Sequence, residues 1–398
     1  MRKRGLLAIC VGVGLLLTAC QPTGPAPTPV LTATPEATPT PVAFHLAADG
    51  SGHYATLEEA IQNVPDGAVI QLGTGIFFVA GPLDIDKPVR LVGVGIENTA
   101  IVGQVGDYVV RFVGEGPFAA EGITFLRKGQ AVGDVVIVEG GEIAFVGCQF
   151  AGGVDEGDQG MGIGLRLEGN TTGLVKDSTV TENDSMGIAV RDQAQPRLES
   201  NAVINNRGVG IGYFDEAGGM AFQNQCTRNV VGVYLDQLAE PTLTENVCVN
   251  NHWDGIAYWG DAGGLARRNT CTGNEKTGIY IGGQARPLLE GNVCSDNEGI
   301  GIVFVGQAGG LAHQNECSRN QLHGIVVDEE AHPTLEKNVC ADNQEAGIAY
   351  FGAASGTVRR NECVGNLVSG IYVAETASPD LDDNDCHDNG VEDIRDLR

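Results

Sequence analysis

A glycine recurs every 22 or 23 residues through more than half of the chain, and each time it opens a short apolar segment. Asparagine follows nineteen residues after every one of these glycines and fourteen residues after nine of them, the latter from Asn201 to Asn384. Cysteine follows sixteen residues after eight of them. A repeat of about 23 residues is too short for a pair of helices, and no leucine-rich pattern accompanies it. The ten glycines are Gly164, Gly187, Gly210, Gly232, Gly255, Gly278, Gly301, Gly324, Gly347 and Gly370.

A coil of this length that holds three short strands is typical of a parallel β-helix, so we predict an all-β solenoid. Equivalent residues of successive coils should stack about 4.8 Å apart, as neighbouring strands do. Asparagines in register are then expected to form ladders, in which each amide bonds the amides above and below it. Asparagine also tolerates left-handed backbone, so we expect it to supply the sharp corners.

Alternation along each strand predicts that the first and third residues after the glycine point inward, and the second and fourth outward. A large third residue is often matched by a small eleventh residue, as in Tyr258 and Ala266. A close-packed interior requires such compensation. The cysteines fit the same interior, and we expect reduced, buried thiols because in-register side chains sit poorly for a disulfide. They are Cys226, Cys248, Cys271, Cys294, Cys317, Cys340, Cys363 and Cys386.

Residues 44–131 lack this pattern, and we expect them to form an N-terminal cap and the first coils, followed by the repeats over 132–398. Thr56 and Glu59 resemble a capping box, and Leu57, Ala60 and Ile61 share one face of the helix that the box would start. We predict that this helix covers the first coil, where an open sheet edge would invite aggregation.

The N-terminus resembles that of a bacterial lipoprotein. Three basic residues precede an apolar run that is too short to span a bilayer comfortably, and the run ends in Leu17-Thr18-Ala19-Cys20. This ending resembles a lipobox and implies a signal peptide over 1–19 and lipidation of Cys20; an ordinary secretory signal is the alternative. Proline and threonine dominate residues 20–43, which indicates an extended tether. We therefore expect an extracytoplasmic protein, lipid-anchored to the outer face of the cell membrane.

The segments 48–56 and 83–93 resemble the start of pectin-lyase-like proteins, and the coils resemble their β-helix repeat. The resemblance covers about residues 44–395 and implies a right-handed parallel β-helix. Its class, often called carbohydrate-binding and sugar-hydrolase domains, includes alginate epimerases, polysaccharide lyases and non-enzymatic repeats, so it implies no single function. Mannuronan epimerases carry an Asp-Pro-His pattern. The nearest string here, Ala331-His332-Pro333, lacks the aspartate and reverses the order, so no catalytic residue is carried over.

Aromatic residues at outward positions form the candidate binding surface. Flat rings along a groove suit stacking against a sugar, and nearby acids can bond to its hydroxyls. Cross-strand aromatic packing under turns is the structural alternative. The ligand-binding candidates are Tyr234, Trp253, Asp254, Trp259 and Tyr280.

Two charged features have simpler interpretations. The twelfth residue after the glycine alternates in sign, which predicts an exposed ladder of weak ion pairs. The acidic segment Asp155-Glu156-Gly157-Asp158 could hold Ca²⁺, although a solvated loop suits it better, and no firm cofactor or metal site is predicted. The alternating residues are Arg267, Glu290, His313, Glu336, Arg359 and Asp382.

The formal net charge of -27 makes nucleic acid an unsuitable partner. Three functions stay open. The first is binding of a polysaccharide or another extracellular surface partner, without a demonstrable active site. The second is a polysaccharide lyase or uronate C5-epimerase with an uncommon site, and the third is a structural or adhesive surface protein.

Overall fold

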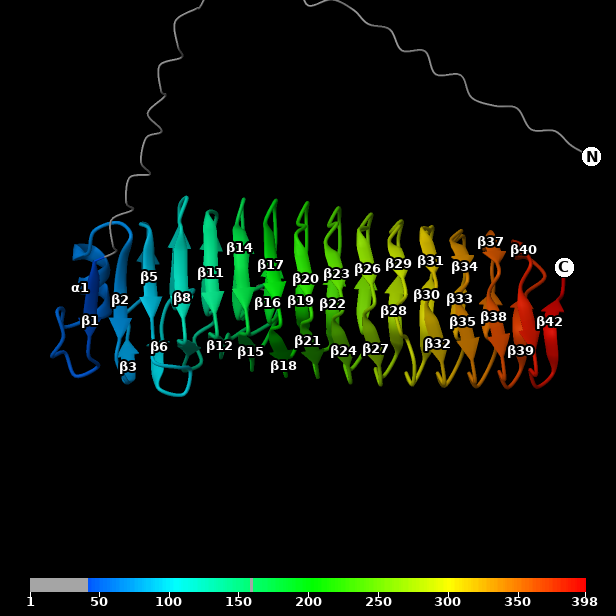
Figure 1. Cartoon of the computed structure of the whole chain (residues 1–398), viewed down its shortest axis with the longest axis horizontal. Coiled ribbons are helices and arrows are strands. Elements are labelled where there is room, and N and C mark those ends of the chain that lie inside the picture. The colour runs from blue at the N-terminus through cyan, green and yellow to red at the C-terminus, as the bar shows by residue number, and fades with distance from the viewer. Residues whose placement is uncertain (1–41, 158–159) are drawn as a thin grey trace, which may run out of the picture. The chain divides into compact units, whose positions relative to one another are not determined.

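The structure, a computed structural model, describes residues 42–157 and 160–398. These residues form a long solenoid of parallel strands with α1 (Leu57–Asn63) at its N-terminal end (Figure 1). The expected signal peptide, the lipidation candidate Cys20 and most of the tether lie outside the described residues. The predicted parallel β-helix is confirmed, because each strand pairs in parallel with its counterpart in the next coil.

Three sheets make up the walls of the described solenoid, and we call them A, B and C. Sheet A has 15 strands. They are β1 (Ala43–Leu46), β2 (Ala68–Leu72), β5 (Val89–Val92), β8 (Phe118–Glu121), β11 (Glu142–Val146), β14 (Thr172–Lys176), β17 (Gln195–Glu199), β20 (Met220–Phe222), β23 (Thr242–Thr244), β26 (Leu265–Arg267), β29 (Leu288–Glu290), β31 (Leu311–His313), β34 (Thr334–Glu336), β37 (Ser355–Arg359) and β40 (Ser378–Asp382).

Sheet C has 14 strands within the described residues and begins each coil. They are β4 (Leu83–Ile85), β7 (Val110–Val113), β10 (Val136–Glu139), β13 (Leu165–Glu168), β16 (Ile188–Val190), β19 (Val209–Tyr213), β22 (Val231–Leu235), β25 (Ile256–Tyr258), β28 (Thr277–Ile281), β30 (Ile300–Phe304), β33 (Ile325–Val327), β36 (Ile348–Tyr350), β39 (Ser369–Val373) and β42 (Glu392–Asp396).

Sheet B falls into a 9-stranded and a 4-stranded part in the described chain, joined at Val293 by single bridges to Thr270 and Glu316. Its strands are β3 (Gly75–Phe78), β6 (Thr99–Gly103), β9 (Thr124–Arg127), β12 (Gln149–Ala151), β15 (Thr179–Thr181), β18 (Ala202–Ile204), β21 (Gln225–Thr227), β24 (Val247–Val249), β27 (Thr270–Thr272), β32 (Glu316–Ser318), β35 (Val339–Ala341), β38 (Glu362–Val364) and β41 (Asp385–His387). Strands of residues 44–131 join the same three sheets as the repeats.

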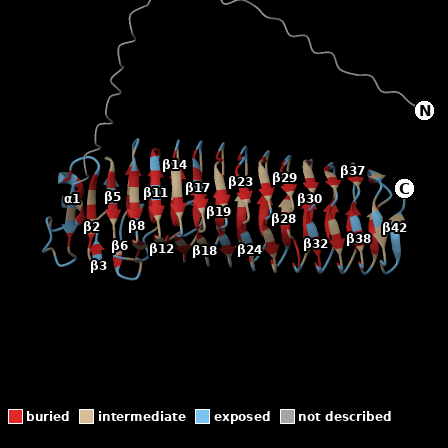
Figure 2. Ribbon diagram, in the orientation of Figure 1, coloured by how far each residue is buried: buried red, intermediate tan, exposed pale blue. Residues whose placement is uncertain are grey.

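The interior follows the predicted alternation. Buried residues lie mainly on the strands (Figure 2), and the first and third residues after all ten repeat glycines are fully buried. Tyr258 at the third position and Ala266 at the eleventh are both fully buried in one coil. The cysteines of the repeat are free thiols, buried from Cys226 to Cys363 and partly exposed at Cys386, as expected for reduced core thiols.

Replacement of Tyr258 by phenylalanine is expected to leave the protein as stable as before or about 1 kcal/mol more stable. The Tyr258 hydroxyl is buried and finds no hydrogen-bond partner in the described part of the chain. Removing the hydroxyl relieves its desolvation cost and keeps the ring. Urea denaturation followed by circular dichroism measures the change, with Tyr234→Phe as control, because the Tyr234 hydroxyl donates to Asp236 Oδ2 at 3.0 Å. A large loss of stability confined to the Tyr258 variant would contradict the expectation.

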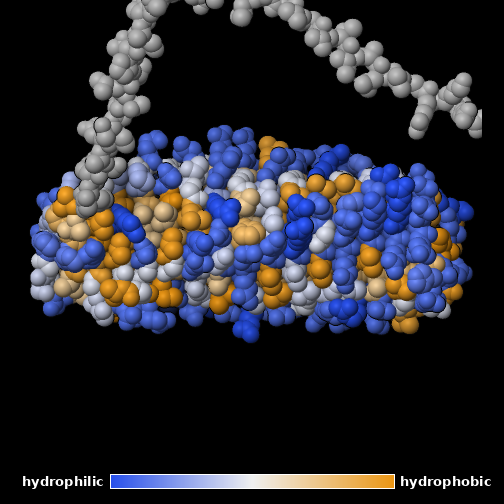
Figure 3. All heavy atoms as spheres, in the orientation of Figure 1, coloured by the Kyte–Doolittle hydropathy of each residue, from blue (hydrophilic) through white to orange (hydrophobic). Residues whose placement is uncertain are grey.

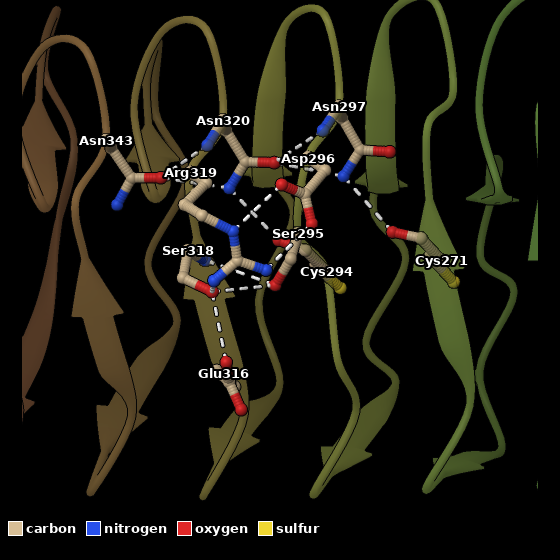
Figure 4. A network of polar contacts seen from close by, with 10 residues as sticks. All are labelled: Cys271, Cys294, Ser295, Asp296, Asn297, Glu316, Ser318, Arg319, Asn320 and Asn343. Atoms are coloured by element: carbon tan, nitrogen blue, oxygen red, sulfur yellow. Dashed lines mark hydrogen bonds and ion pairs between the residues drawn. The ribbon is translucent and has the colours of Figure 1, made fainter.

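The asparagine ladders are confirmed. In the column of Figure 4, the Asn297 side-chain amide donates to Asn320 Oδ1 at 3.0 Å and to the Cys271 carbonyl at 3.1 Å. The Asn297 backbone N–H donates to the same Asn320 oxygen at 3.1 Å. In every bond between two asparagines of this column, the donor lies in the N-terminal coil and the accepting oxygen in the next coil. At the last coil, Asp393 replaces the missing amide and accepts from Asn389 at 3.0 Å.

The expectation that these asparagines supply the left-handed corners is wrong. The left-handed residue is the one before the ladder position, as at Arg268 (φ 52) before Asn269 and at Asp296 (φ 57) before Asn297. A left-handed residue turns the chain, so that the next side chain points into the solenoid. The ladder amide then meets its neighbours from an ordinary backbone conformation.

The glycine that opens each coil is required by close approach rather than by its backbone conformation. A Cβ atom at Gly278 would lie 2.6 Å from the Gly301 carbonyl oxygen and 2.8 Å from the Cys294 Cβ. It would also lie 3.1 Å from the Asn297 amide nitrogen. Glycine, cysteine and asparagine, the three markers of the repeat, therefore meet at one corner of each coil from Gly232 to Gly370.

The outer surface carries the predicted ion-pair ladder on sheet A. Arg267 lies 3.4 Å from Glu290, and Glu336 lies 3.1 Å from Arg359 and 3.6 Å from His313. The Arg267 and Glu290 side chains keep about a third or more of their surface in solvent, so their pair adds little stability. The Glu336 side chain is only 13% exposed, so its charge is less screened. Figure 3 shows one long face of the solenoid, where hydrophilic residues dominate and hydrophobic residues gather over the N-terminal coils.

Helix α1 has the expected start and packing. The Thr56 hydroxyl accepts from the Glu59 backbone N–H at 3.2 Å, and Leu57, Ala60 and Ile61 are buried. The Glu59 carboxylate reaches back one residue further than a standard capping box, to the Ala55 backbone N–H at 3.0 Å. The apolar face of α1 thus joins the core of the first coils, as predicted.

Candidate ligand-binding site

The outer face of sheet C is hollowed into a pocket with a volume of about 450 Å³. We call it the aromatic groove. All five candidates named from the sequence lie in its lining. They are Tyr234, Trp253, Asp254, Trp259 and Tyr280.

Strand register explains the shape of the groove. Ala257 on β25 pairs with Tyr234 on β22 and with Tyr280 on β28, so a small side chain lies between two large ones. Because neighbouring strands lie about 4.8 Å apart, the backbones of the two tyrosines lie about 9.6 Å apart on the sheet. The alanine leaves open the space between them and forms the floor.

The aromatic rings keep much of their surface in solvent. Trp259 stacks on Tyr280 with ring centroids 5.1 Å apart and an interplanar angle of 29°. Trp253 remains 50% exposed and Trp259 41% exposed, which is high for the largest apolar side chains. Trp259 and Tyr280 therefore support one another by stacking, while both tryptophans keep free surface for a ligand.

Asp254 brings a carboxyl group into this apolar setting, and only 9% of the residue is exposed. Burial raises the pKa of Asp254 to about 6, while the polar groups of Thr277 and the charge of Lys276 act in the opposite direction. The Lys276 Nζ lies 4.0 Å from the centroid of the Trp253 ring, in a cation–π contact. Burial and the Asp254 charge also raise the pKa of Tyr280. The groove therefore combines flat apolar surface, one carboxyl group and one ammonium group.

The sequence reasoning missed Lys276, Thr277 and Ala257. The repeat could have identified two of them. Lys276 stands at the same position of its coil as Trp253, and Ala257 stands at the same position as Tyr234 and Tyr280. Two polar neighbours of the tryptophans lie outside the lining of the groove: His252 contacts Glu275 at 2.9 Å, and Asp261 is exposed. His332, from the string nearest to an epimerase motif, lies outside it too.

Four coils further on, the same face carries a smaller pocket of about 300 Å³. Phe351 lies against Tyr372 there with centroids 5.5 Å apart, which repeats the relation between Trp259 and Tyr280. His323 accepts from the Ala346 backbone N–H at 3.1 Å, and burial lowers its pKa. Buried Val303 and Val326 fill the outer face between the two pockets.

The calcium candidate is only partly described, because Asp158 lies outside the described residues. Asp155 Oδ1 accepts from the Gly157 backbone N–H at 3.1 Å, as in an ordinary loop. Among the described residues, no group of His, Cys, Asp and Glu is arranged to hold a metal ion. No helix in the same residues has the length and apolar character needed to cross a membrane.

Comparison with known families agrees with the observed coils. A family model described as the right-handed β-helix region matches residues 131–248 and 231–389. The chain belongs to the right-handed β-helix family. This β-helix protein has no match among curated protein sequences.

Solved structures share the architecture of this β-helix protein at low sequence identity. The periplasmic alginate epimerase AlgG aligns over 86% of this chain and 83% of its own, with 13% identity and a TM-score of 0.52. The A-module of mannuronan C-5 epimerase AlgE4 from Azotobacter vinelandii aligns over 83% of this chain and 89% of its own, with 16% identity and a TM-score of 0.51. At such identity the likeness shows the fold alone.

Proposed function

We propose that the protein binds an extracellular carbohydrate in the aromatic groove and is held at the outer face of the cell membrane by a lipid on Cys20. The observation that carries the binding proposal is the convergence of four partly exposed aromatic rings and one buried carboxyl group in a single pocket. Sugars offer flat C–H faces for stacking and hydroxyl groups for bonding to Asp254. The two epimerases of the same fold, whose names specify alginate and mannuronan, make a polysaccharide ligand a natural candidate.

Replacement of Trp259 by alanine is expected to weaken carbohydrate binding by at least about tenfold, because the variant loses one stacking wall and the support that it gives to Tyr280. A glycan array first identifies polymers that the parent chain retains, and titration calorimetry then measures both affinities. Phe351→Ala is the matched control, since Phe351 holds the same position in its coil, packs on Tyr372 and lies outside the groove.

Unchanged affinity of the Trp259 variant for every retained polymer would overturn this site. Retention of no polymer by the parent would overturn carbohydrate binding and favour a structural or adhesive surface protein. Equal losses in the Trp259 and Phe351 variants would show that the effect comes from the sheet as a whole.

A polysaccharide lyase or uronate C5-epimerase is the second candidate. Removal of a proton next to a carboxylate needs a base and a group that neutralises the carboxylate. The groove holds Asp254, whose pKa of about 6 suits a base, and Lys276 as a neutralising cation. Absorbance of unsaturated uronate, with and without Ca²⁺, and exchange of the C5 proton in deuterium oxide test the two reactions. Absence of both on every bound uronate polymer would exclude this candidate.

A further inference from the structure

We propose that the aromatic groove selects a carbohydrate with a free, protonated amino group, and that Asp254 holds the ammonium. The inference rests on the proposed carbohydrate binding and names the class of sugar: an amino sugar whose nitrogen is not acylated. Three features of the groove support it, namely a buried carboxylate, a cation already seated on one ring, and the arrangement of the other rings.

The first feature is the carboxylate. Asp254 is buried against Thr277, and none of the ion pairs in the described part of the chain includes it. At pH 7 Asp254 is largely ionised, since burial raises its pKa only to about 6. The charge of Lys276 acts on Asp254 only from beyond contact distance, so the buried carboxylate remains costly. An ammonium group of a ligand offsets this cost best, because it can form a charge-assisted hydrogen bond with the carboxylate. A neutral sugar would leave the charge of the Asp254 carboxylate uncompensated.

The second feature is the cation that the chain supplies itself. Lys276 Nζ rests 4.0 Å from the centroid of Trp253, within the range of a cation–π contact. The wall of the groove therefore already attracts an ammonium group, although Lys276 forms no ion pair with Asp254 among the described residues. A ligand amine between Asp254 and the rings would compete with Lys276, whose long side chain is free to swing into solvent.

The third feature is the remaining wall. Tyr234, Trp259 and Tyr280 surround the alanine floor, so the sugar ring stacks while its amine points to the carboxylate. The formal net charge of -27 acts in the same direction at long range, because it attracts cationic polymers and repels polyuronates.

Two oligosaccharides of equal length separate this inference from simple sugar binding. The purified full chain is titrated with a glucosamine tetramer and with an N-acetylglucosamine tetramer, in 150 mM and in 500 mM salt. The titrations are done at pH 7, where glucosamine amines still carry protons and Asp254 is largely ionised. We expect the free-amine tetramer to bind at least about tenfold tighter, because a charge-assisted contact is added at a desolvated site. The preference should persist in high salt, which screens exposed charges far more than buried ones.

Two variants with opposite expected effects locate the selectivity. Asp254→Asn should abolish the preference for the free amine, whereas Asp261→Asn, which removes the same charge from an exposed position outside the groove, should keep it. Lys276→Met should strengthen binding of the free-amine tetramer severalfold, because the competing internal cation is gone. A merely structural role of Lys276 would weaken binding of both tetramers alike.

The outcomes distinguish the inference from the function on which it rests. Equal binding of both tetramers would overturn amine selection and leave carbohydrate binding intact. A preference that Asp261→Asn removes as well as Asp254→Asn, or that disappears in 500 mM salt, would show attraction to the acidic surface and overturn the inference. Binding of neither tetramer would overturn it too, and the glycan array then decides whether carbohydrate binding itself survives.

Discussion

Replacement of Gly278 by alanine will lower the free energy of unfolding by about 3 kcal/mol or more. The added Cβ would lie 2.6 Å from the Gly301 carbonyl oxygen and 2.8 Å from the Cys294 Cβ. Neither atom can move alone, because Gly301 opens the next coil and Cys294 belongs to the stacked thiols. Relief requires that two coils separate or shift, and that breaks the strand pairing of β28 with β30. Thermal and urea denaturation of the full chain measure the effect.

Gly81→Ala is the matched control for this substitution. Apart from its two neighbours in the chain, no described residue has an atom within 4 Å of the Cβ that alanine would add at Gly81, and Gly81 has no left-handed backbone. Its stability should therefore stay within about 0.5 kcal/mol of the parent. If both variants were equally stable, close approach would not be the reason for the repeating glycine.

Replacement of Asn292 by alanine will cost about 3–5 kcal/mol. Asn292 Oδ1 accepts the Asn269 backbone N–H at 2.9 Å and the Asn269 side-chain amide at 3.0 Å. Its own amide donates to the Ala266 carbonyl and to Asn315 Oδ1, both at 2.9 Å. The variant leaves these groups without partners in a fully buried corner. Denaturation midpoints and hydrogen exchange of the Asn269 amide report the loss.

Asn384→Ala gives the control at the end of the same column. Asn384 accepts from Asn361 in the same way, at 3.1 and 3.0 Å, but it lies in the last coil and is only partly buried. Water can replace the lost bonds there, so we expect a cost of about 1 kcal/mol. Equal costs at Asn292 and Asn384 would mean that burial does not set the strength of the ladder.

These two expectations bear on function, because the aromatic groove exists only while three coils stay in register. Tyr234, Ala257 and Tyr280 come from three different strands, and a shift of one residue in any strand would turn its side chain inward. The buried corner of glycine, cysteine and asparagine and the ladder that contains Asn292 help to hold that register. The loss of either should therefore weaken ligand binding even when the variant remains folded.

The sequence alone predicted the parallel β-helix, the inward and outward positions, the amide ladders and the five residues of the candidate site. It could do so because a solenoid with an in-register repeat turns position in the sequence directly into position on a wall. Residues 23 apart become neighbours, so Tyr234, Trp253, Asp254, Trp259 and Tyr280 could be grouped before any coordinates were known.

Only the tertiary structure showed how deeply these residues are buried and which neighbours they contact. It showed that the residue before each ladder asparagine carries the left-handed turn, that Asp254 is buried, and that Lys276 lies over Trp253. The repeat could not determine these features, because burial depends on the size of neighbours in the adjoining coils and a lysine side chain has many rotamers. The repeat determines on which wall and on which face each side chain is attached. Packing against the next coil determines its rotamer and its burial.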